Sequence, residues 1–192
     1  MSQLAINFFG GPSSGKSVLA AYSYALLKAQ GLNVELVREY AKDLVWSNNA
    51  TMLRNQELVT TTQSLRQRSL YGKVDAIITD SPLMLGVAYD ERASTFAKRK
   101  WVQSVSDEFH RYDNINIMLM RNKSFEFEQE GRVHNLEESL EMDKKILRIV
   151  KQYCKEGHVK LYVKELKRMW DEIKVLLVSQ IMEVKKNAAG TR

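Results

Sequence analysis

Residues 10–17 read Gly-Gly-Pro-Ser-Ser-Gly-Lys-Ser and match the pattern GxxxxGK[ST] at every fixed position. The apolar stretch Leu4–Phe9 precedes them and reads as a buried strand, and a helical pattern follows from about residue 16 to residue 30. Glycines let the chain turn so that successive main-chain N–H groups point at an anion, and the following helix adds its positive N-terminal end. The stretch therefore predicts a loop that binds the phosphate groups of a nucleotide.

The same pattern predicts which groups bind the nucleotide. Lys16 is expected to reach the β- and γ-phosphates, and Ser17 to supply a hydroxyl group to Mg²⁺. The expected nucleotide-binding residues are Gly10, Gly11, Pro12, Ser13, Ser14, Gly15, Lys16, Ser17 and Val18. ATP and Mg²⁺ are therefore the expected ligand and metal ion.

Strand and helix patterns alternate along the whole chain. Strands are expected at 4–9, 33–37, 75–79, 114–120 and 158–163, and helices at about 16–30, 39–46, 55–70, 83–90, 94–111, 136–155 and 165–186. This alternation predicts an α/β fold, a three-layer P-loop sandwich with a five-stranded parallel sheet and helices on both faces. The expected strand order is 2-3-1-4-5. One domain is expected over residues 1–186, with a flexible tail at 187–192.

Composition and charge limit the class of protein. The 192 residues are 44% hydrophobic and 27% charged, as in soluble globular proteins, and the single cysteine, Cys154, excludes a disulfide framework and a Cys-based zinc site. No stretch is long and apolar enough for a signal peptide or a membrane span, which predicts a cytoplasmic protein without membrane partners. The net charge is +6; residues 97–192 hold 20 Lys and Arg against 15 Asp and Glu. That surplus favours phosphate-bearing partners, or lysine-rich solvated helices.

Two carboxylates follow neighbouring strands of the expected sheet. Arg38-Glu39-Tyr40 comes after the second strand, and Asp80-Ser81-Pro82 after the third. Ligands of parallel α/β sheets bind at the carboxyl ends of the strands, where such an acid can orient Mg²⁺ or accept the proton of an attacking hydroxyl. The alternative is a carboxylate at a helix N-terminus that interacts with the helix dipole.

Together, Gly10–Ser17, Arg38-Glu39-Tyr40 and Asp80-Ser81-Pro82 resemble the P-loop kinases of small molecules and nucleic acids, in particular nicotinamide-riboside-kinase-like and deoxynucleoside-kinase-like members. In the deoxynucleoside kinases a glutamate after strand two is the general base, and an acid-Arg-Ser triplet follows strand three. Glu39 matches the first position, whereas Asp80-Ser81-Pro82 lacks the arginine, so either acid remains a candidate for the base. The resemblance implies the following roles: catalytic Lys16, Asp80, Glu39, Arg121 and Arg132; substrate-binding Arg38, Gln63 and Ser81; metal-binding Ser17 and Asp80.

Gln63 matches a glutamine that deoxynucleoside kinases use to read a nucleobase edge, although Gln56 and Gln67 lie nearby on the same expected helix.

Residues 121–135 are polar and are expected to form a lid in which Arg121 and Arg132 balance the charge of the transferred phosphoryl group. The alternative is an ordinary charged surface loop. Asp143, on the helix after this loop, is expected to anchor a lid arginine or a substrate hydroxyl, or to lie at the edge of an apolar stripe.

These observations predict an ATP-dependent kinase with a hydroxyl acceptor of the nucleoside type. One expected acceptor is a free nucleoside or nucleotide, such as nicotinamide riboside. The other is 5-hydroxymethyluracil within DNA, which some bacteriophage members of the resembled family phosphorylate. If this protein is of phage origin, its expected location is the host cytoplasm. Lys98-Arg99-Lys100-Trp101 and Arg92 suit a DNA backbone and a stacked base, although a helical Trp more often belongs to the core.

The alternative from another class is a P-loop binding switch. The GTPase pattern NKxD is absent, because Asn122-Lys123 is followed by Ser124-Phe125. The oligomeric state is not indicated.

Overall fold

A computed structural model describes residues 3–120, 135–154, 158–162 and 170–179, and for 158–162 it describes the backbone alone. The strands are β1 (Gln3–Phe9), β2 (Val34–Val37), β3 (Ala76–Thr79), β4 (Tyr112–Met120) and β5 (His158–Tyr162). The helices are α1 (Lys16–Ala29), α2 (Tyr40–Trp46), α3 (Ala50–Arg54), α4 (Gln56–Arg68), α5 (Leu83–Tyr89), α6 (Phe96–Phe109) and α7 (Leu136–Tyr153), and residues 170–179 are also helical.

The strands form one sheet in the order β2-β3-β1-β4-β5, and all neighbouring strands are parallel. Ile6 of β1 lies opposite Ile78 of β3 and Ile115 of β4, so the first strand is central. The predicted α/β architecture with a parallel sheet is therefore confirmed. Its arrangement places the loop after β1 at the middle of the carboxyl edge, where P-loop and strand-end residues meet.

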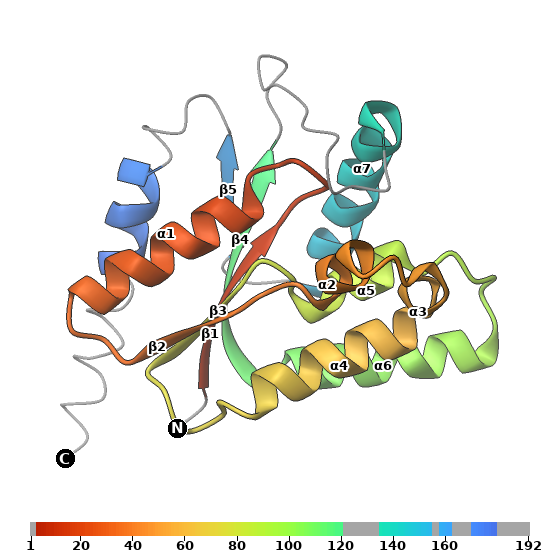
Figure 1. Ribbon diagram of the computed structural model, residues 1–192, viewed down its shortest axis with the longest axis horizontal. Helices are drawn as coiled ribbons and strands as arrows, with labels where there is room; N and C mark the ends of the chain where they lie inside the picture. Colours follow the sequence, from red (N-terminus) through yellow and green to blue (C-terminus); the bar gives the residue numbers. More distant parts are fainter. Residues whose placement is uncertain (1–2, 121–134, 155–157, 163–169, 180–192) are drawn as a thin grey trace.

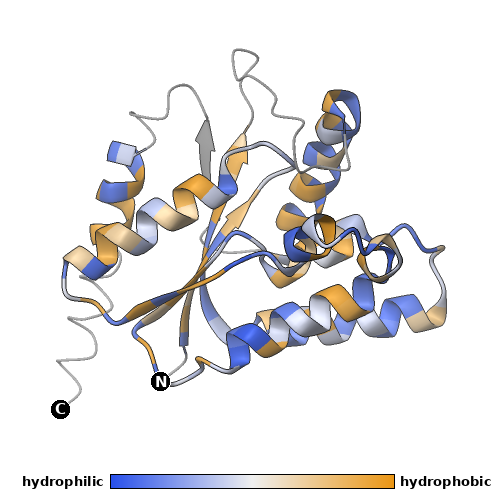
Figure 2. Ribbon diagram, in the orientation of Figure 1, coloured by the Kyte–Doolittle hydropathy of each residue, from blue (hydrophilic) through white to orange (hydrophobic). Residues whose placement is uncertain are grey.

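Helices cover both faces of the sheet (Figure 1). On one face, Leu19 and Leu27 of α1 and Ile173 of the last helix pack against Ile6 and Phe8. The other face is covered by α5, α6 and α7, and α4 lies against α5 and α6. Figure 2 shows hydrophobic residues concentrated on the central strands and along α1. Each fully buried Leu, Ile or Phe side chain contributes about 1.5–3 kcal/mol of transfer free energy, so this core holds the loop ends in place.

The helix α3 was not predicted from the sequence, whose patterns indicate no element at residues 50–54. The side chain of Asn49 begins it by accepting a hydrogen bond from the Met52 N–H at 3.2 Å. Asn55 then ends α3 and begins α4, accepting from the Leu58 N–H at 3.1 Å. The two asparagines thus divide the segment into two capped helices.

Most of the expected lid, residues 121–134 with Arg121 and Arg132, lies outside the described residues. Asn135 is described and forms a capping box with Glu138 at the start of α7. In the described ranges no helix combines the length and the hydrophobicity that crossing a membrane requires.

Candidate phosphate-binding site

The loop between β1 and α1 has the backbone geometry of an anion-binding turn. Ser13 and Gly15 have φ angles of 59° and 87°, in the left-handed region, and Gly10 has a φ of 150°. The Ser14 N–H donates to the Gly11 carbonyl at 3.3 Å, which closes the turn. Left-handed residues in such a turn aim successive N–H groups into one concavity, where they can bind phosphate oxygens.

The N-terminus of α1 adds positive potential to this loop. Gly15 is the N-cap residue, no side chain of the described residues caps the helix, and its first turn contains no acid. The free N–H groups of an uncapped first turn carry partial positive charge. Ser17 lies in this turn and is exposed, so its hydroxyl is accessible to an ion that accompanies the phosphates.

Lys16 is held over the loop. Its side chain is only 7% exposed, and its Nζ donates to the Gly11 carbonyl at 2.9 Å. A buried ammonium group beside main-chain amides is suited to bind an anion. The structure thus brings the predicted phosphate-binding residues together around one loop.

An acid from α7 contacts the same loop. The Gly11 N–H donates to Asp143 Oδ1 at 2.8 Å, a contact across 132 residues of sequence. A Cβ atom added at Gly11 would overlap Asp143 Oδ1 and lie 3.0 Å from the Ser139 carbonyl, so the close approach of α7 requires glycine here. None of the three roles expected for Asp143 included this contact. The signal in the sequence was a carboxylate near an apolar stripe, which does not identify its partner.

The two strand-end acids lie side by side but differ in exposure. Asp80 is 4% exposed, and its Oδ1 accepts a hydrogen bond from the Glu39 N–H at 3.0 Å. Glu39 is half-buried at the start of α2. Next to Asp80, the Ser81 N–H donates to Thr79 Oγ1 at 3.0 Å. The hydrogen bond from Glu39 joins the ends of β2 and β3, as the strand order requires.

Gln63 and Arg38 both contact protein groups of α2. Gln63 is 2% exposed; its Oε1 accepts from the Tyr40 N–H at 3.1 Å, and its Nε2 donates to Thr79 Oγ1 at 3.4 Å. The amide expected to read a base therefore bonds to the protein and fixes the start of α2. The Arg38 guanidinium is mostly exposed and lies 3.8 Å from Asp43.

A cavity of about 450 Å³ opens beside the phosphate-binding loop. It extends from the loop between α2, α3 and the end of α5. Its lining residues are Pro12, Lys16, Glu39, Ala41, Lys42, Val45, Leu53, Arg54, Gln56, Tyr89, Asp90, Glu91 and Arg92. Glu39 is thus a wall residue of this cavity, and the lining does not include Asp80.

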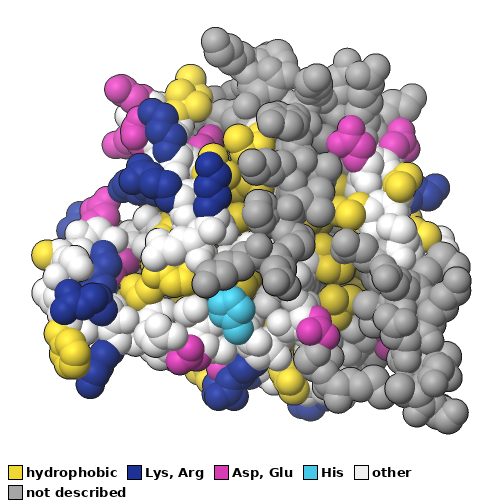
Figure 3. Space-filling model, turned by 180° about the vertical axis from the view of Figure 1, so that it is seen from behind, with side chains coloured by type: hydrophobic (Ala, Val, Ile, Leu, Met, Phe, Trp, Pro, Cys, Tyr) yellow, Lys and Arg dark blue, Asp and Glu magenta, His cyan; other side chains and the backbone are white. Residues whose placement is uncertain are grey.

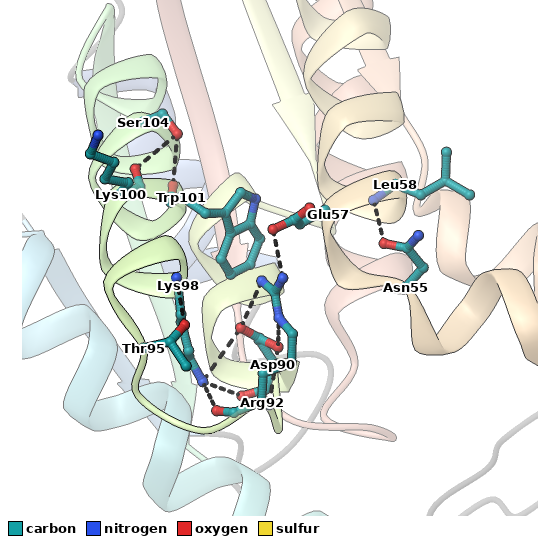
Figure 4. Close-up of polar contacts among 10 residues, drawn as sticks. All are labelled: Asn55, Glu57, Leu58, Asp90, Arg92, Thr95, Lys98, Lys100, Trp101 and Ser104. Atoms are coloured by element: carbon teal, nitrogen blue, oxygen red, sulfur yellow. Dashed lines mark hydrogen bonds and ion pairs between the residues drawn. The ribbon is translucent and has the colours of Figure 1, made fainter.

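One wall of the cavity is fixed by an ion-pair cluster (Figure 4). The Arg92 guanidinium donates to Asp90 Oδ1 at 2.8 Å and to Glu57 Oε1 at 2.6 Å, and its centre lies 4.9 Å from the Trp101 ring centroid. Burial favours the protonated form of Asp90, but its hydrogen bonds to Arg92 and the charge of Lys98 outweigh burial, so the pKa of Asp90 is lowered.

The same cluster engages Arg92, Lys98 and Trp101, which the sequence suggested for contact with DNA. Arg92 bonds to two carboxylates and covers Trp101, which packs against the core. Lys98 Nζ donates to the carbonyls of Asp90 and Arg92 at 3.0 and 2.6 Å. The polar and aromatic groups of Arg92, Lys98 and Trp101 thus contact one another and neighbouring protein groups, and these contacts stabilise the turn between α5 and α6.

Within the described part of the chain, no three His, Cys, Asp or Glu side chains gather at one place to hold a metal ion. Mg²⁺ at nucleotide sites is commonly bound by one or two protein groups together with water and substrate phosphates. The exposed Ser17 hydroxyl and the Asp80 carboxylate are groups of that kind.

Comparison with protein families gives a match to a family model described as an AAA domain, over residues 5–163. Comparison with curated proteins gives no match. The matched range contains the phosphate-binding loop and extends from β1 to the residue after β5, well over half of the chain. With the loop geometry and the parallel sheet, this match shows that the chain belongs to the AAA domain family of P-loop nucleotide-binding proteins.

Proposed function

We propose that this AAA domain is an ATP-dependent kinase that transfers the γ-phosphate of ATP to a hydroxyl group of a nucleoside-type acceptor. The observation that supports it is the 450 Å³ cavity whose wall includes Lys16 and Glu39. Cavities of several hundred Å³ hold molecules of nucleoside size or larger. ATP hydrolysis requires space for a water molecule only, so a cavity of this size beside the phosphate loop favours a second substrate.

In the proposed reaction the acceptor hydroxyl oxygen forms a bond to the γ-phosphorus, and the bond from that phosphorus to the β–γ bridging oxygen breaks. ADP leaves, and a carboxylate accepts the hydroxyl proton. The loop amides and Lys16 hold the phosphates throughout. Mg²⁺ bound with ATP would neutralise phosphate charge, and Ser17 and Asp80 are the residues proposed to hold it.

We assign proton acceptance to Glu39, because Glu39 lines the cavity. Asp80 is buried and bonded to the Glu39 backbone, which suits a positioning or metal-binding role. The proposal keeps Arg121 and Arg132 as lid arginines, and residues 1–186 as one kinase domain. The positions of Gln63 and Arg38 favour structural roles for both residues.

A small acceptor is favoured over 5-hydroxymethyluracil within DNA. A DNA strand requires a continuous track of unpaired basic groups that leads to the site. Arg92 and Lys98, two members of the expected track, bond within the protein. On the face seen from behind, the visible Lys and Arg side chains lie in separate groups with acidic side chains among them (Figure 3).

The test is incubation with ATP labelled at the γ-phosphate and one acceptor at a time: free nucleosides, nucleoside monophosphates, or DNA that contains 5-hydroxymethyluracil. Label in a small acceptor supports the proposal, and label in DNA supports the second acceptor. We expect Lys16→Ala to abolish transfer. The control Lys28→Ala changes a lysine of the same helix that pairs with Glu35, and it should transfer normally. Label only in inorganic phosphate would contradict a kinase and favour a hydrolysing or switching domain.

A further inference from the structure

The cavity has two cationic residues on the side formed by α2 and α3. Lys42 of α2 and Arg54 of α3 both line it. Lys42 is half-buried, and Arg54 is exposed. Within the described part of the chain, neither side chain makes a hydrogen bond or an ion pair.

The nearest acids in sequence are bonded to other arginines. Asp43, next to Lys42, lies 2.9 Å from Arg66 and 3.8 Å from Arg38. Glu57, three residues after Arg54, lies 2.6 Å from Arg92. Asp43 and Glu57 are thus engaged by other arginines and are not ion-paired with Lys42 or Arg54.

The other charged groups of the lining are distributed differently. Arg92 is balanced by Asp90 and Glu57. Lys16 belongs to the phosphate loop. The remaining acids of the lining are Glu39, at the start of α2, and the exposed Glu91, beyond α5. Apart from the phosphate loop and the ion pairs of Arg92, the cations of the lining are therefore Lys42 and Arg54, both on the α2–α3 side.

We propose that the acceptor is a phosphorylated nucleoside whose own phosphate is bound by Lys42 and Arg54. A guanidinium can bind phosphate through two N–H groups, and an ammonium adds a point charge. In Figure 1, α3 lies on the far side of α2 from the phosphate loop, so the bound phosphate would lie at the outer end of the cavity. The acceptor hydroxyl then lies toward Lys16 and Glu39.

The inference rests on the proposed kinase function and adds the acceptor's charge to it. The anchoring phosphate takes no part in the reaction: the γ-phosphoryl group moves to the hydroxyl, and the products are ADP and an acceptor that carries both phosphates. A charged group far from the reacting oxygen supplies binding energy that orients it. A free monophosphate is favoured over a DNA phosphodiester because Arg92 and Lys98, beside this cavity, are engaged by the protein.

The test is a binding measurement that needs no turnover. The protein is saturated with ADP and Mg²⁺, so that the phosphate loop is filled, and titrated by calorimetry with the common ribo- and deoxyribonucleoside 5′-monophosphates and with the matching nucleosides. We expect at least one monophosphate to bind about tenfold or more tightly than its nucleoside, from one or two charge-assisted hydrogen bonds. Lys42→Gln with Arg54→Gln should remove that preference. The charge-matched control, Lys144→Gln with Arg148→Gln on α7, should keep it, since these residues do not line the cavity.

Equal affinity for nucleosides and monophosphates would overturn the inference, as would a Lys42/Arg54 variant with unchanged affinity. Binding of an oligonucleotide through the same two residues, with no monophosphate bound, would overturn it in favour of a phosphodiester. The proposed function fails separately: if a monophosphate binds through Lys42 and Arg54 but receives no label from ATP, the phosphate site stands and the kinase does not. Circular dichroism of each variant shows whether it is folded.

Discussion

The different environments of Glu39 and Asp80 predict different kinetic effects of their amide variants. Glu39 lines the cavity, so Glu39→Gln removes the proposed proton acceptor while it keeps the side chain's shape. We expect kcat to fall about 10²- to 10⁴-fold, the usual contribution of general base catalysis. The KM for ATP should change little, because the loop and Lys16 bind the phosphates.

Steady-state kinetics over a range of ATP concentrations measures both constants. In the companion variant Asp80→Asn, the amide oxygen can still accept the Glu39 N–H, but the negative charge is lost. A Glu39→Gln enzyme that retains more than about a tenth of the wild-type kcat would exclude Glu39 as the base.

Gly11 predicts a second effect at the residue scale. In Gly11→Ala the new methyl group would overlap Asp143 Oδ1 and press on the Ser139 carbonyl, so the loop or α7 must shift. We expect the affinity for ADP, measured by calorimetry, to fall about tenfold or more, because loop amides displaced by about 1 Å no longer match the phosphate oxygens.

The control is Gly31→Ala, where a Cβ atom meets nothing within 4 Å but φ is 76°. That variant should lose about 1–2 kcal/mol of stability, the cost of a left-handed alanine, and should bind ADP normally. Combining Gly11→Ala with Asp143→Ala should restore part of the affinity. Normal ADP binding by Gly11→Ala alone would show that the contact with α7 is not required.

At this scale, the sequence predicted the residues whose role depends on a local motif. Gly10 to Ser17 are adjacent in the chain, and the pattern itself specifies the turn and the helix that follows. The contact of Asp143 with Gly11 spans 132 residues and depends on how α7 packs, which no local pattern encodes. For Gln63 too, the sequence did not indicate the hydrogen bonds to Tyr40 and Thr79 that the fold brings about.

At the scale of elements, α4 and α5 approach each other closely at Gly86. A Cβ atom added there would overlap Thr60 Oγ1 and lie 3.2 Å from Thr60 Cβ. We expect Gly86→Ala to lower stability by about 1–3 kcal/mol through overpacking, although alanine is the better helix former. Thermal unfolding should show a decrease of several degrees in Tm for a domain of this size.

The double variant Gly86→Ala with Thr60→Ala tests the cause. Thr60 Oγ1 is buried and has no hydrogen-bond partner in the described structure, so its removal relieves the overlap without the loss of a bond. The double variant should regain most of the lost Tm. If it is no more stable than Gly86→Ala, the steric explanation is wrong.

The elements differ in how far the sequence could predict them. The strands β1 and β3 are mostly apolar and were predicted to within a residue at each end. The five-residue helix α3 was missed because its stability depends on the caps Asn49 and Asn55 and on its neighbours, since so short a helix is not stable alone. Arg54 of this helix is one of the two residues that we propose bind the acceptor's phosphate, so that part of the proposed site could not be predicted from the sequence.

At the scale of the whole molecule, Cys154 reports on unfolding. It is the chain's single cysteine, is 2% exposed, and packs in the core between α7 and the sheet. Burial raises the pKa of its thiol to about 12, because a thiolate would be poorly solvated there. The fold therefore favours the protonated thiol over the thiolate. The resulting contribution to the free energy of unfolding is complete below the unfolded pKa of about 8.5 and is lost as the pH rises toward 12.

The folded protein should therefore react slowly with a thiol reagent such as 5,5′-dithiobis(2-nitrobenzoate) at pH 8. We expect less than about a hundredth of the rate in denaturant, because only the thiolate reacts and the core must open to expose it. ADP with Mg²⁺ should slow the reaction further, by the factor 1 + [ADP]/Kd, because the nucleotide binds only the folded chain. Lys16→Ala should react at a rate that ADP does not change. A wild-type rate independent of ADP would mean that the end of α7 opens by itself, and a rate equal to that in denaturant would mean that the core around Cys154 is not closed in solution.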